Sequence, residues 1–473
     1  MSGPEVPASQ RDELRTTFEG QRAACAREPI PSVAKRRAQL ESLGAMIKAA
    51  QPKIAQAISD DFGHRAPQET ALLEVFTSLE AIRYTARNVA RWTKPERRHV
   101  SIWNRPGYAR LHKHPLGVVG IIVPWNYPLY LAAGPLVSAL AAGNRAMIKM
   151  SEYTPSFGAL WSQLLGATFP AEEVAVINGG IEIAQEFGRL PFDHLIFTGS
   201  TAVGREVMRA AAEHLTPVTL ELGGKSPVIV CEDYPVELAA RRILFGKCSN
   251  AGQTCVAPDY VLIPRDKVAA FVRSARDAVT EFFPKLGSGD YTSIASERQY
   301  AHLTAYLDDA RAKGATEHAL HGEPSDAAAR RLSPVVLTDV TAEMRVMQEE
   351  IFGPILPVIP YTTLDEAIAF VNARPRPLAL YAFSDDRRAI DRILSGTVSG
   401  GVTVNDTMLH VAQDALPFGG IGPSGMGVYH GREGFDALSK LRGVYRQRRY
   451  NPFSLLFPPY GERFSRLIRI MLR

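Results

Sequence analysis

The chain has 473 residues, of which 46% are hydrophobic and 22% charged, a composition typical of a globular protein that buries a sizeable core. This composition excludes a disordered chain, a collagen and a small disulfide-stapled protein, and the length predicts about three domains. The net charge of +5 is concentrated in residues 441–473, which hold eight arginines and one acidic residue, a local charge of +7, so the rest carries −2. Nucleic-acid-binding proteins usually spread positive charge over a face of the fold, so we expect no nucleic-acid partner.

The cysteine pattern and the N-terminus bear on the compartment. The four cysteines are widely scattered, at Cys25, Cys231, Cys248 and Cys255. They form no CxxC pair and no zinc-type spacing, so we expect no metal site, no disulfide framework and a reducing, cytoplasmic location. The polar first residues lack the apolar run of a secretory signal. The apolar stretch 116–140 is interrupted by prolines, which argues against a spanning helix.

In chain order, the first hundred residues show helical periodicity and the following residues show alternating strands and helices. Helices are predicted over 36–58 and 69–92, with Gly63 as a cap. Residues 94–113 are basic and irregular and predict an arm. Strands are predicted at 117–123, 145–149, 195–198, 218–221, 228–230, 260–263, 358–361 and 380–384. Helices are predicted at 129–142, from the glycine turn 199–204 to 214, and at 268–283 and 364–372. Continuous apolar strands alternating with helices predict α/β architecture with parallel sheets covered on both faces.

Two motifs directly follow predicted strands, where ligands gather in a parallel sheet. The first is PWNYP (124–128), in which two prolines fix the turn that carries Asn126, whose neutral amide suits an oxyanion site. The alternative is an ordinary turn residue. The second is ELGGKSP (221–227), in which Glu221 is a candidate general base or, alternatively, a surface loop acid.

Three further motifs carry candidate chemistry. Cys255 ends NAGQTC (250–255), a polar loop that can expose a reactive thiol, although a structural cysteine is the alternative. QEEIFGP (348–354) offers paired acids that either bond sugar hydroxyls or cap a loop. Gly199 and Gly204 open a predicted helix whose N-terminal amides suit a phosphate, although the spacing matches neither GxGxxG nor a P-loop.

The order of these motifs resembles the NAD(P)-dependent aldehyde dehydrogenase superfamily. The matching pieces are PWNYP, IKMSE, FTGSTAVG, LELGGKSP, GQTC, EEIFGP and LPFGGIGPSGMGVYHGREGFD, over about residues 30–445. Within the superfamily, the tyrosine-containing CVAPDYVLI and GMGVYHGREGFD resemble the class 3 branch. DFGHRAPQET, GIIVPWNYPLYLAAGPL and AAGNRAMIK are similar to bacterial coniferyl aldehyde dehydrogenases.

The resemblance implies roles for the catalytic set. Cys255 would be the nucleophile that forms a thiohemiacetal and then a thioester. Asn126 and the backbone N–H of Cys255 would hold the oxyanion, and Glu221 would activate the hydrolytic water.

The resemblance also implies a cofactor site. Lys149 and Glu152 would contact the adenine-side ribose, and Glu350 would bind the nicotinamide ribose. The remaining cofactor-site residues would be Thr198, Gly199, Ser200 and Gly204 on the pyrophosphate side, and Phe352 and Trp125 near the nicotinamide. For Trp125 and Tyr127, the alternatives are that they line an apolar entrance or that they belong to the core. An acid at Glu152 should repel a 2′-phosphate, so we expect NAD, with NADP as the alternative. IKMSE has Met150 where many relatives have proline, and Ser439-Lys440 stands where a Ser-His is frequent; neither change touches the catalytic set.

The resemblance predicts a fold of two parallel-sheet α/β domains, a Rossmann-type cofactor domain and a catalytic domain, plus a small β oligomerisation arm. The expected bounds are 1–93 and 116–222 for the NAD(P)-binding domain, 223–409 for the catalytic domain, 94–115 and 410–445 for the bridging arm, and 446–473 for a basic tail. A homodimer is expected from the same resemblance.

The tail ends in RFSRLIRIMLR (463–473), a basic amphipathic helix by its periodicity. Residues 452–473 are therefore a candidate for peripheral contact with the inner membrane face, or alternatively for packing on the chain itself or on a partner subunit. The expected substrate is a hydrophobic aldehyde, aryl such as coniferyl aldehyde, or fatty. The alternative functions are a CoA-acylating enzyme, a non-redox cysteine acyltransferase or hydrolase, and a catalytically silent binding protein on the same fold.

Overall fold

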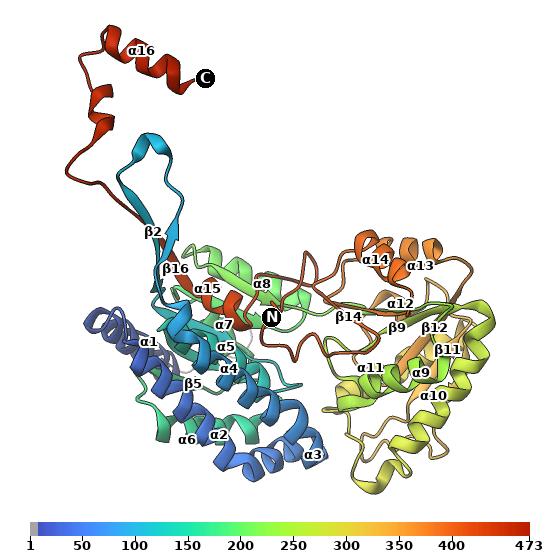
Figure 1. Ribbon diagram of the computed structural model, residues 1–473. Coiled ribbons are helices and arrows are strands. Elements are labelled where there is room, and N and C mark those ends of the chain that lie inside the picture. Colours follow the sequence, from blue (N-terminus) through green and yellow to red (C-terminus); the bar gives the residue numbers. More distant parts are fainter. Residues whose placement is uncertain (1–7) are drawn as a thin grey trace.

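The computed structural model describes residues 8–473 as two lobes, each built on its own sheet, with an arm that leaves the first lobe (Figure 1). Residues 1–7, which open the predicted cofactor domain and carry part of the polar N-terminus, lie outside the described residues. The predicted α/β class is confirmed, because helices cover two largely parallel sheets.

A six-stranded sheet forms the centre of the first lobe, in the order β15-β7-β6-β3-β4-β5. Its strands are β3 (Val118–Ile122), β4 (Arg145–Lys149), β5 (Val174–Ile177), β6 (His194–Thr198), β7 (Val218–Glu221) and β15 (Gly425–Met426). All neighbours are parallel except β15, which pairs antiparallel with β7. Alternate residues of β3 show why its sequence is continuously apolar: Val119 and Ile121 join one core cluster, whereas Val118 joins another on the opposite face.

Helices cover both faces of this sheet. They are α1 (Ala8–Arg27), α2 (Val33–Phe62), α3 (Pro67–Thr70), the π-helix η1 (Ala71–Phe76), α4 (Thr77–Trp92), α5 (Tyr130–Ala142), α6 (Pro155–Thr168), α7 (Ile181–Gly188) and α8 (Thr201–Ala212). Gly63 ends α2 with a left-handed φ of 78°, as the sequence predicts. The helix predicted over 69–92 is one helical run with a π-helical turn at 71–76, which local periodicity does not reveal.

A seven-stranded sheet forms the centre of the second lobe, in the order β10-β11-β12-β9-β8-β13-β14. Its strands are β8 (Pro227–Val230), β9 (Tyr260–Pro264), β10 (Thr316–Ala319), β11 (Val335–Thr338), β12 (Ile355–Tyr361), β13 (Ala379–Phe383) and β14 (Gly401–Val404); only the edge strand β10 is antiparallel. Its helices are α9 (Val236–Cys248), α10 (Val268–Phe282), α11 (Glu297–Ala312), α12 (Arg345–Gln348), α13 (Leu364–Asn372) and α14 (Arg387–Gly396).

A three-stranded antiparallel sheet forms the arm, from β1 (Glu96–Arg98), β2 (Tyr108–Pro115) and β16 (Ser439–Arg446), with β2 in the middle. Strand β16 follows α15 (Gly431–Ala437), which packs against α4 and α5 of the first lobe, and pairs along the whole of β2. Before β16, the chain also adds β15 to the sheet of the first lobe, so part of the segment 410–445 lies in that sheet. The domain bounds themselves stay a prediction.

The tail continues from β16 beyond the arm and lies away from both lobes (Figure 1). It contains the short helix η6 (Pro452–Leu456) and α16 (Glu462–Met471), in which no residue is buried. Across residues 8–473, the structure contains no helix with the length and apolarity that a membrane span requires.

Candidate active site

The candidate nucleophile Cys255 lies in the wall of an apolar cavity of about 690 Å³. The preceding turn η3 (Ser249–Gly252) holds Asn250 and Ala251 in the left-handed region, with φ of 52° and 51°. Burial raises the pKa of the Cys255 thiol to about 12, and the nearby carboxyls of Glu350 and Glu221 raise it further. The structure therefore brings Cys255, Glu221 and Glu350 together, from three separate segments of the chain.

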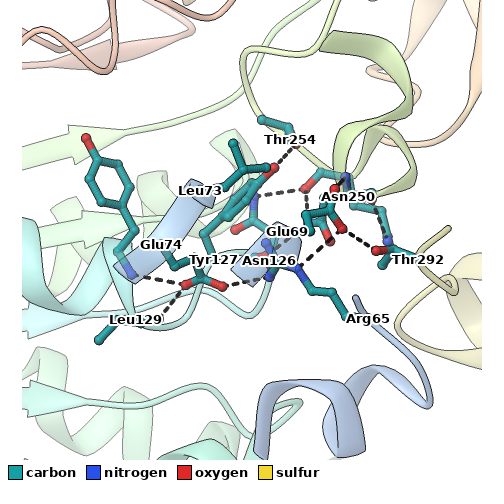
Figure 2. Close-up of polar contacts among 12 residues, drawn as sticks. Arg65, Glu69, Leu73, Glu74, Asn126, Tyr127, Leu129, Asn250, Thr254 and Thr292 are labelled. Carbon is teal, nitrogen blue, oxygen red and sulfur yellow. Dashed lines mark hydrogen bonds and ion pairs between the residues drawn. The ribbon is translucent and has the colours of Figure 1, made fainter. Parts of the chain in front are cut away.

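The cavity around Cys255 is lined mainly by aliphatic and aromatic side chains. They include Leu72, Leu73 and Phe76 from η1, Tyr127 and Tyr130 from the Asn126 loop and α5, Phe245 from α9, Phe282 from α10, and Met408, Leu409, Val411 and Phe418. Tyr127 therefore lines the cavity, which is the apolar-entrance alternative of the two predicted for it. Its hydroxyl is satisfied by Thr254 Oγ1 at 2.8 Å, next to Cys255 (Figure 2).

Asn126 is buried and faces the loop that carries Cys255. Its side-chain Nδ2 donates to the carbonyl oxygen of Gln253 at 3.1 Å, two residues before the cysteine. Its own backbone carbonyl accepts from Asn250 Nδ2 at 3.0 Å. The predicted oxyanion residue and the predicted nucleophile therefore belong to two loops that are hydrogen-bonded to each other.

Glu221 is the last residue of β7 and is only 2% exposed. Within the part of the chain that the structure describes, neither of its carboxyl oxygens has a hydrogen-bond partner. Burial therefore raises the pKa of Glu221 well above the usual range of a glutamate. Such a carboxyl is suited to accept a proton near neutral pH.

Glu350 packs against the glycine turn that follows β7. A Cβ at Gly223 would lie 1.9 Å from Glu350 Oε2, so only a glycine leaves room for the carboxyl there. Burial raises the pKa of Glu350 to about 8, and Oε1 is buried without a partner among residues 8–473. Trp125 meets Phe352 edge-to-face at a centroid distance of 5.4 Å and lies 6.1 Å from Phe62, so it bridges the two lobes.

The other predicted cofactor residues lie along the carboxyl edge of the first sheet. Lys149 ends β4, and its Nζ donates to the carbonyl oxygens of Met150 at 2.6 Å and Gly179 at 2.7 Å. Burial lowers the pKa of this ammonium, whereas the carboxylate of Glu152, which is exposed, raises it. The two side chains lie close enough for this charge effect, and their contact with the ribose stays a prediction.

The turn from β6 into α8 holds the remaining predicted residues. Thr198 ends β6, and the Ser200 hydroxyl caps α8 by accepting the N–H of Val203 at 3.4 Å. A Cβ at Gly199 would lie 2.5 Å from the Phe197 ring, and one at Gly204 would lie 2.7 Å from Leu222, so both glycines permit close packing. A helix N-terminus leaves its first N–H groups without intrahelical partners, which suits an anion.

These features together fit a bound dinucleotide. The carboxyl edge of the first sheet offers a helix N-terminus and a lysine. Beside it lie a buried carboxyl oxygen of Glu350, which has no partner among residues 8–473, and the aromatic pair of Trp125 and Phe352. In residues 8–473 no group of histidine, cysteine and acidic side chains has the arrangement of a metal site.

One set of residues at the site carries no predicted role, namely Arg65, Glu69 and Glu74. All three contact the Asn126 loop or the Cys255 loop, as Figure 2 shows. The only sequence signal is that Arg65 and Glu69 fall within DFGHRAPQET, one of the pieces behind the family resemblance. Nothing in their spacing marks them as neighbours of the catalytic loops.

The comparisons agree with this geometry. The model of the aldehyde dehydrogenase family matches residues 4–444, so the chain belongs to the aldehyde dehydrogenase family. The chain is 53% identical to a probable coniferyl aldehyde dehydrogenase of Pseudomonas aeruginosa over 97% of this chain and 96% of the relative. The predicted resemblance is thereby confirmed, and the chain is an NAD(P)-dependent aldehyde dehydrogenase.

Two solved structures are similar to the whole fold. A substrate-bound state of Staphylococcus aureus AldH has a TM-score of 0.92 at 39% identity, covering 97% of this chain and 99% of that one. An aldehyde dehydrogenase of Mycobacterium tuberculosis complexed with NAD+ has a TM-score of 0.85 at 31% identity, covering 94% of this chain and 92% of that one.

Proposed function

We propose that the chain oxidises a hydrophobic aldehyde, with aryl aldehydes such as coniferyl aldehyde first and fatty aldehydes second. The observation that carries this proposal is the apolar cavity that ends at Cys255. An aromatic ring or alkyl chain in that cavity loses contact with water, while its aldehyde carbon reaches the sulfur. The similarity to a probable coniferyl aldehyde dehydrogenase supports the aryl class.

In this proposal Cys255 is the nucleophile, and its sulfur adds to the aldehyde carbon. The side-chain amide of Asn126 and the backbone N–H of Cys255 donate hydrogen bonds to the oxygen that becomes negative. The nicotinamide, when bound, supplies the hydride acceptor. A thioester is then left on Cys255.

Glu221 removes a proton from the water that attacks this thioester. Its lack of hydrogen-bond partners among the described residues, and its raised pKa, support this role. Attack of the hydroxide on the thioester breaks the carbon–sulfur bond and releases the carboxylic acid. The Cys255 thiolate that leaves then takes the proton held by Glu221, which restores the thiol and the carboxylate.

The proposed cofactor contacts involve residues along the carboxyl edge of the first sheet, together with Glu350 and its aromatic neighbours. We assign Lys149 and Glu152 to the adenine-side ribose and Glu350, with Phe352 and Trp125 beside it, to the nicotinamide ribose. The pyrophosphate side is assigned to Thr198, Gly199, Ser200 and Gly204. Because a carboxylate at Glu152 repels a 2′-phosphate, we propose NAD as the preferred cofactor; tighter binding of NADP in cofactor titrations would overturn that choice.

The test is NADH absorbance with coniferyl aldehyde, benzaldehyde and a medium-chain alkanal, for the wild type and Cys255→Ala. Wild-type turnover that is lost in Cys255→Ala is expected, with the highest kcat/KM for coniferyl aldehyde. Turnover that appears only with added coenzyme A would favour the CoA-acylating alternative. Ester hydrolysis without NADH would favour a non-redox hydrolase, and no activity with either cofactor would favour a binding protein.

We further propose a homodimer joined through the arm. The edge strand β16 leaves its outer backbone groups unpaired and exposes Leu441, Val444 and Tyr445. A second copy that adds to this edge would cover them. A monomer in light scattering at micromolar concentration would contradict the dimer.

For the tail we propose peripheral contact of a cytoplasmic enzyme with the inner membrane face, with subunit packing as the alternative. Helix α16 has no buried residue and combines arginines with an apolar stripe. Co-sedimentation with vesicles of anionic lipid should be lost when residues 452–473 are removed. Unchanged co-sedimentation contradicts membrane contact, and a dimer that dissociates on truncation supports the alternative.

A further inference from the structure

We propose that Arg65, Glu69 and Glu74, together called the Arg65 cluster, are positioning residues that hold the Asn126 loop against the Cys255 loop. The inference rests on the proposed roles of Asn126 and Cys255. None of the three side chains is among the residues proposed to contact the cofactor. Each one acts through a hydrogen bond or ion pair with one of the two loops.

The cluster begins with an arginine that is completely buried. Arg65 Nη1 lies 2.7 Å from Glu74 Oε1, and both side chains are 0% exposed. Arg65 Nε lies 3.7 Å from Glu69 Oε2, and the guanidinium stands 5.4 Å from the Phe62 ring centroid and 4.8 Å from that of Tyr127. A buried ion pair adds little net stability, because desolvation offsets most of the attraction, so its cost calls for another explanation.

Glu74 holds the Asn126 loop from behind. Its Oε2 accepts the backbone N–H groups of Leu129 at 2.8 Å and Tyr130 at 3.1 Å, where α5 begins (Figure 2). The carboxylate therefore caps the helix that follows the loop and complements its dipole. Arg65 Nη1 adds a long hydrogen bond of 3.4 Å to the carbonyl oxygen of Asn126 itself.

Glu69 holds the Cys255 loop. It accepts the backbone N–H of Asn250 at 2.5 Å and the hydroxyl of Thr292. Asn250 is one of the two non-glycine residues of η3 in the left-handed region, a backbone state that costs energy in a residue with a Cβ. A fixed acceptor for its N–H stabilises this state, and with it the direction in which the chain reaches Cys255.

The two halves of the cluster meet at Asn126. Its carbonyl oxygen accepts from both Arg65 and Asn250, and its side-chain amide and that of Asn250 both donate to the Gln253 carbonyl. Loss of Glu69 or Arg65 would therefore shift the Asn126 amide relative to the sulfur. A misplacement of about 1 Å at such a group can reduce the rate on the order of 100-fold.

The π-helix explains how both acids reach one arginine. In a regular α-helix, positions five apart point about 140° away from each other. The wider turn of η1, which begins two residues after Glu69 and contains Glu74, lets both carboxyls face Arg65. The same turn directs Leu72, Leu73 and Phe76 to the wall of the cavity, so it serves both the substrate pocket and the cluster.

The test compares Glu69→Ala, Glu69→Gln and Arg65→Lys with the wild type. In Glu69→Ala, kcat per folded enzyme should fall at least about tenfold, whereas KM for NAD+ should stay within twofold. Glu69→Gln retains an oxygen for the Asn250 N–H and should restore kcat to within about threefold of the wild type. Arg65→Lys keeps the charge but loses the planar fork, and should also lower kcat about tenfold.

A second measurement needs neither cofactor nor aldehyde. The alkylation rate of Cys255 by iodoacetamide, followed by the mass of its peptide, should rise at least about threefold in Glu69→Ala, because a loosened loop exposes the thiol. Glu172→Ala is the matched control, since it removes a surface acid that pairs with Arg27 at 50% exposure. This control should leave kcat and alkylation unchanged.

The outcomes separate the inference from the proposed function. If the wild type is active but the kcat per folded enzyme and the alkylation rate of Glu69→Ala and Arg65→Lys stay within twofold of the wild type, the positioning role is overturned. If Glu69→Ala does not fold, Arg65→Lys decides by the same two measurements. If the wild type makes no NADH with any aldehyde, the proposed function fails, and the alkylation rates still decide the positioning role.

Discussion

Substitution of Gly223 by alanine should weaken binding of the dinucleotide while leaving the fold intact. The added Cβ would lie 1.9 Å from Oε2, 2.5 Å from Cδ and 2.6 Å from Oε1 of Glu350. Carbon atoms do not approach so closely, so the carboxyl has to move by about 1 Å or more. Because the clash is with the end of a flexible side chain, rotation of Glu350 relieves it without a shift of the backbone.

The magnitude follows from the hydrogen bonds that the proposed ribose contact loses. Burial raises the pKa of Glu350 to about 8, so at pH 7 the carboxyl is mostly protonated. Neutral hydrogen bonds contribute about 1 kcal/mol each, so losing one or two weakens binding by about 1–2 kcal/mol. The Kd for NAD+ should therefore rise roughly five- to thirtyfold.

The assay is NAD+ binding to the purified protein without aldehyde, by calorimetry or fluorescence, with the thermal midpoint measured in parallel. Gly166→Ala in α6 is the matched control, because a Cβ there meets nothing within 4 Å. It should leave the Kd unchanged and stabilise the helix by up to about 1 kcal/mol. A Gly223→Ala variant that binds NAD+ within twofold of the wild type would refute the assignment of Glu350.

Three further changes address the proposed base Glu221, the cavity wall at Phe245 and the buried His194. Glu221→Gln should release one equivalent of NADH in a rapid burst and then turn over about 10²- to 10⁴-fold more slowly; steady turnover within tenfold of the wild type would contradict its role as the base. Phe245→Ala, which trims the cavity wall, should raise the KM for coniferyl aldehyde about fivefold and leave that for propanal unchanged; an equal change for both would argue against ring binding there. Burial lowers the pKa of His194 to about 4, below its unfolded value of about 6.5, so its contribution to stability is complete above pH 6.5 and is lost as the pH falls toward 4. His194→Gln should therefore flatten the fall in unfolding free energy between pH 6.5 and 5 by up to about 2 kcal/mol; an unchanged slope would show that other groups cause it.

Much of the fold could be predicted because its strands and helices have local signals. Strands β4 and β7 and helix α13 occupy the predicted residues, since each is an apolar or amphipathic run with clear ends. The short strands β5, β11 and β14 were not predicted, because four-residue segments that are wholly or partly apolar also occur in buried helices and loops. The strand order, and the return of β16 to β2, depend on contacts far apart in sequence, which no local pattern contains.

The candidate site could be predicted in part for a related reason. Asn126 follows the parallel strand β3 and Glu221 is the last residue of the parallel strand β7. Such strands end at one edge of their sheet, so a rule of topology brings the two residues to the same edge. Cys255 belongs to the other lobe, and its approach to Glu221 depends on how the two sheets meet. The physics of single segments could not predict this approach. The order of the motifs predicted it, through the resemblance to the aldehyde dehydrogenase superfamily.

The Arg65 cluster shows where such prediction ends. A regular helix over 69–92 turns Glu74 about 140° away from Glu69. Arg65 lies before that helix, so helical spacing relates it to neither acid. The sequence therefore does not predict that both acids face one arginine. In the structure Glu74 is completely buried, and the turn that rotates it inward is the π-helix η1. A π-helical turn is stabilised by what its side chains contact, here the α5 N-terminus and the cavity, and not by the residues of the turn itself. The feature that joins pocket and catalytic loops is thus a consequence of the assembled fold, and only a structure could reveal it.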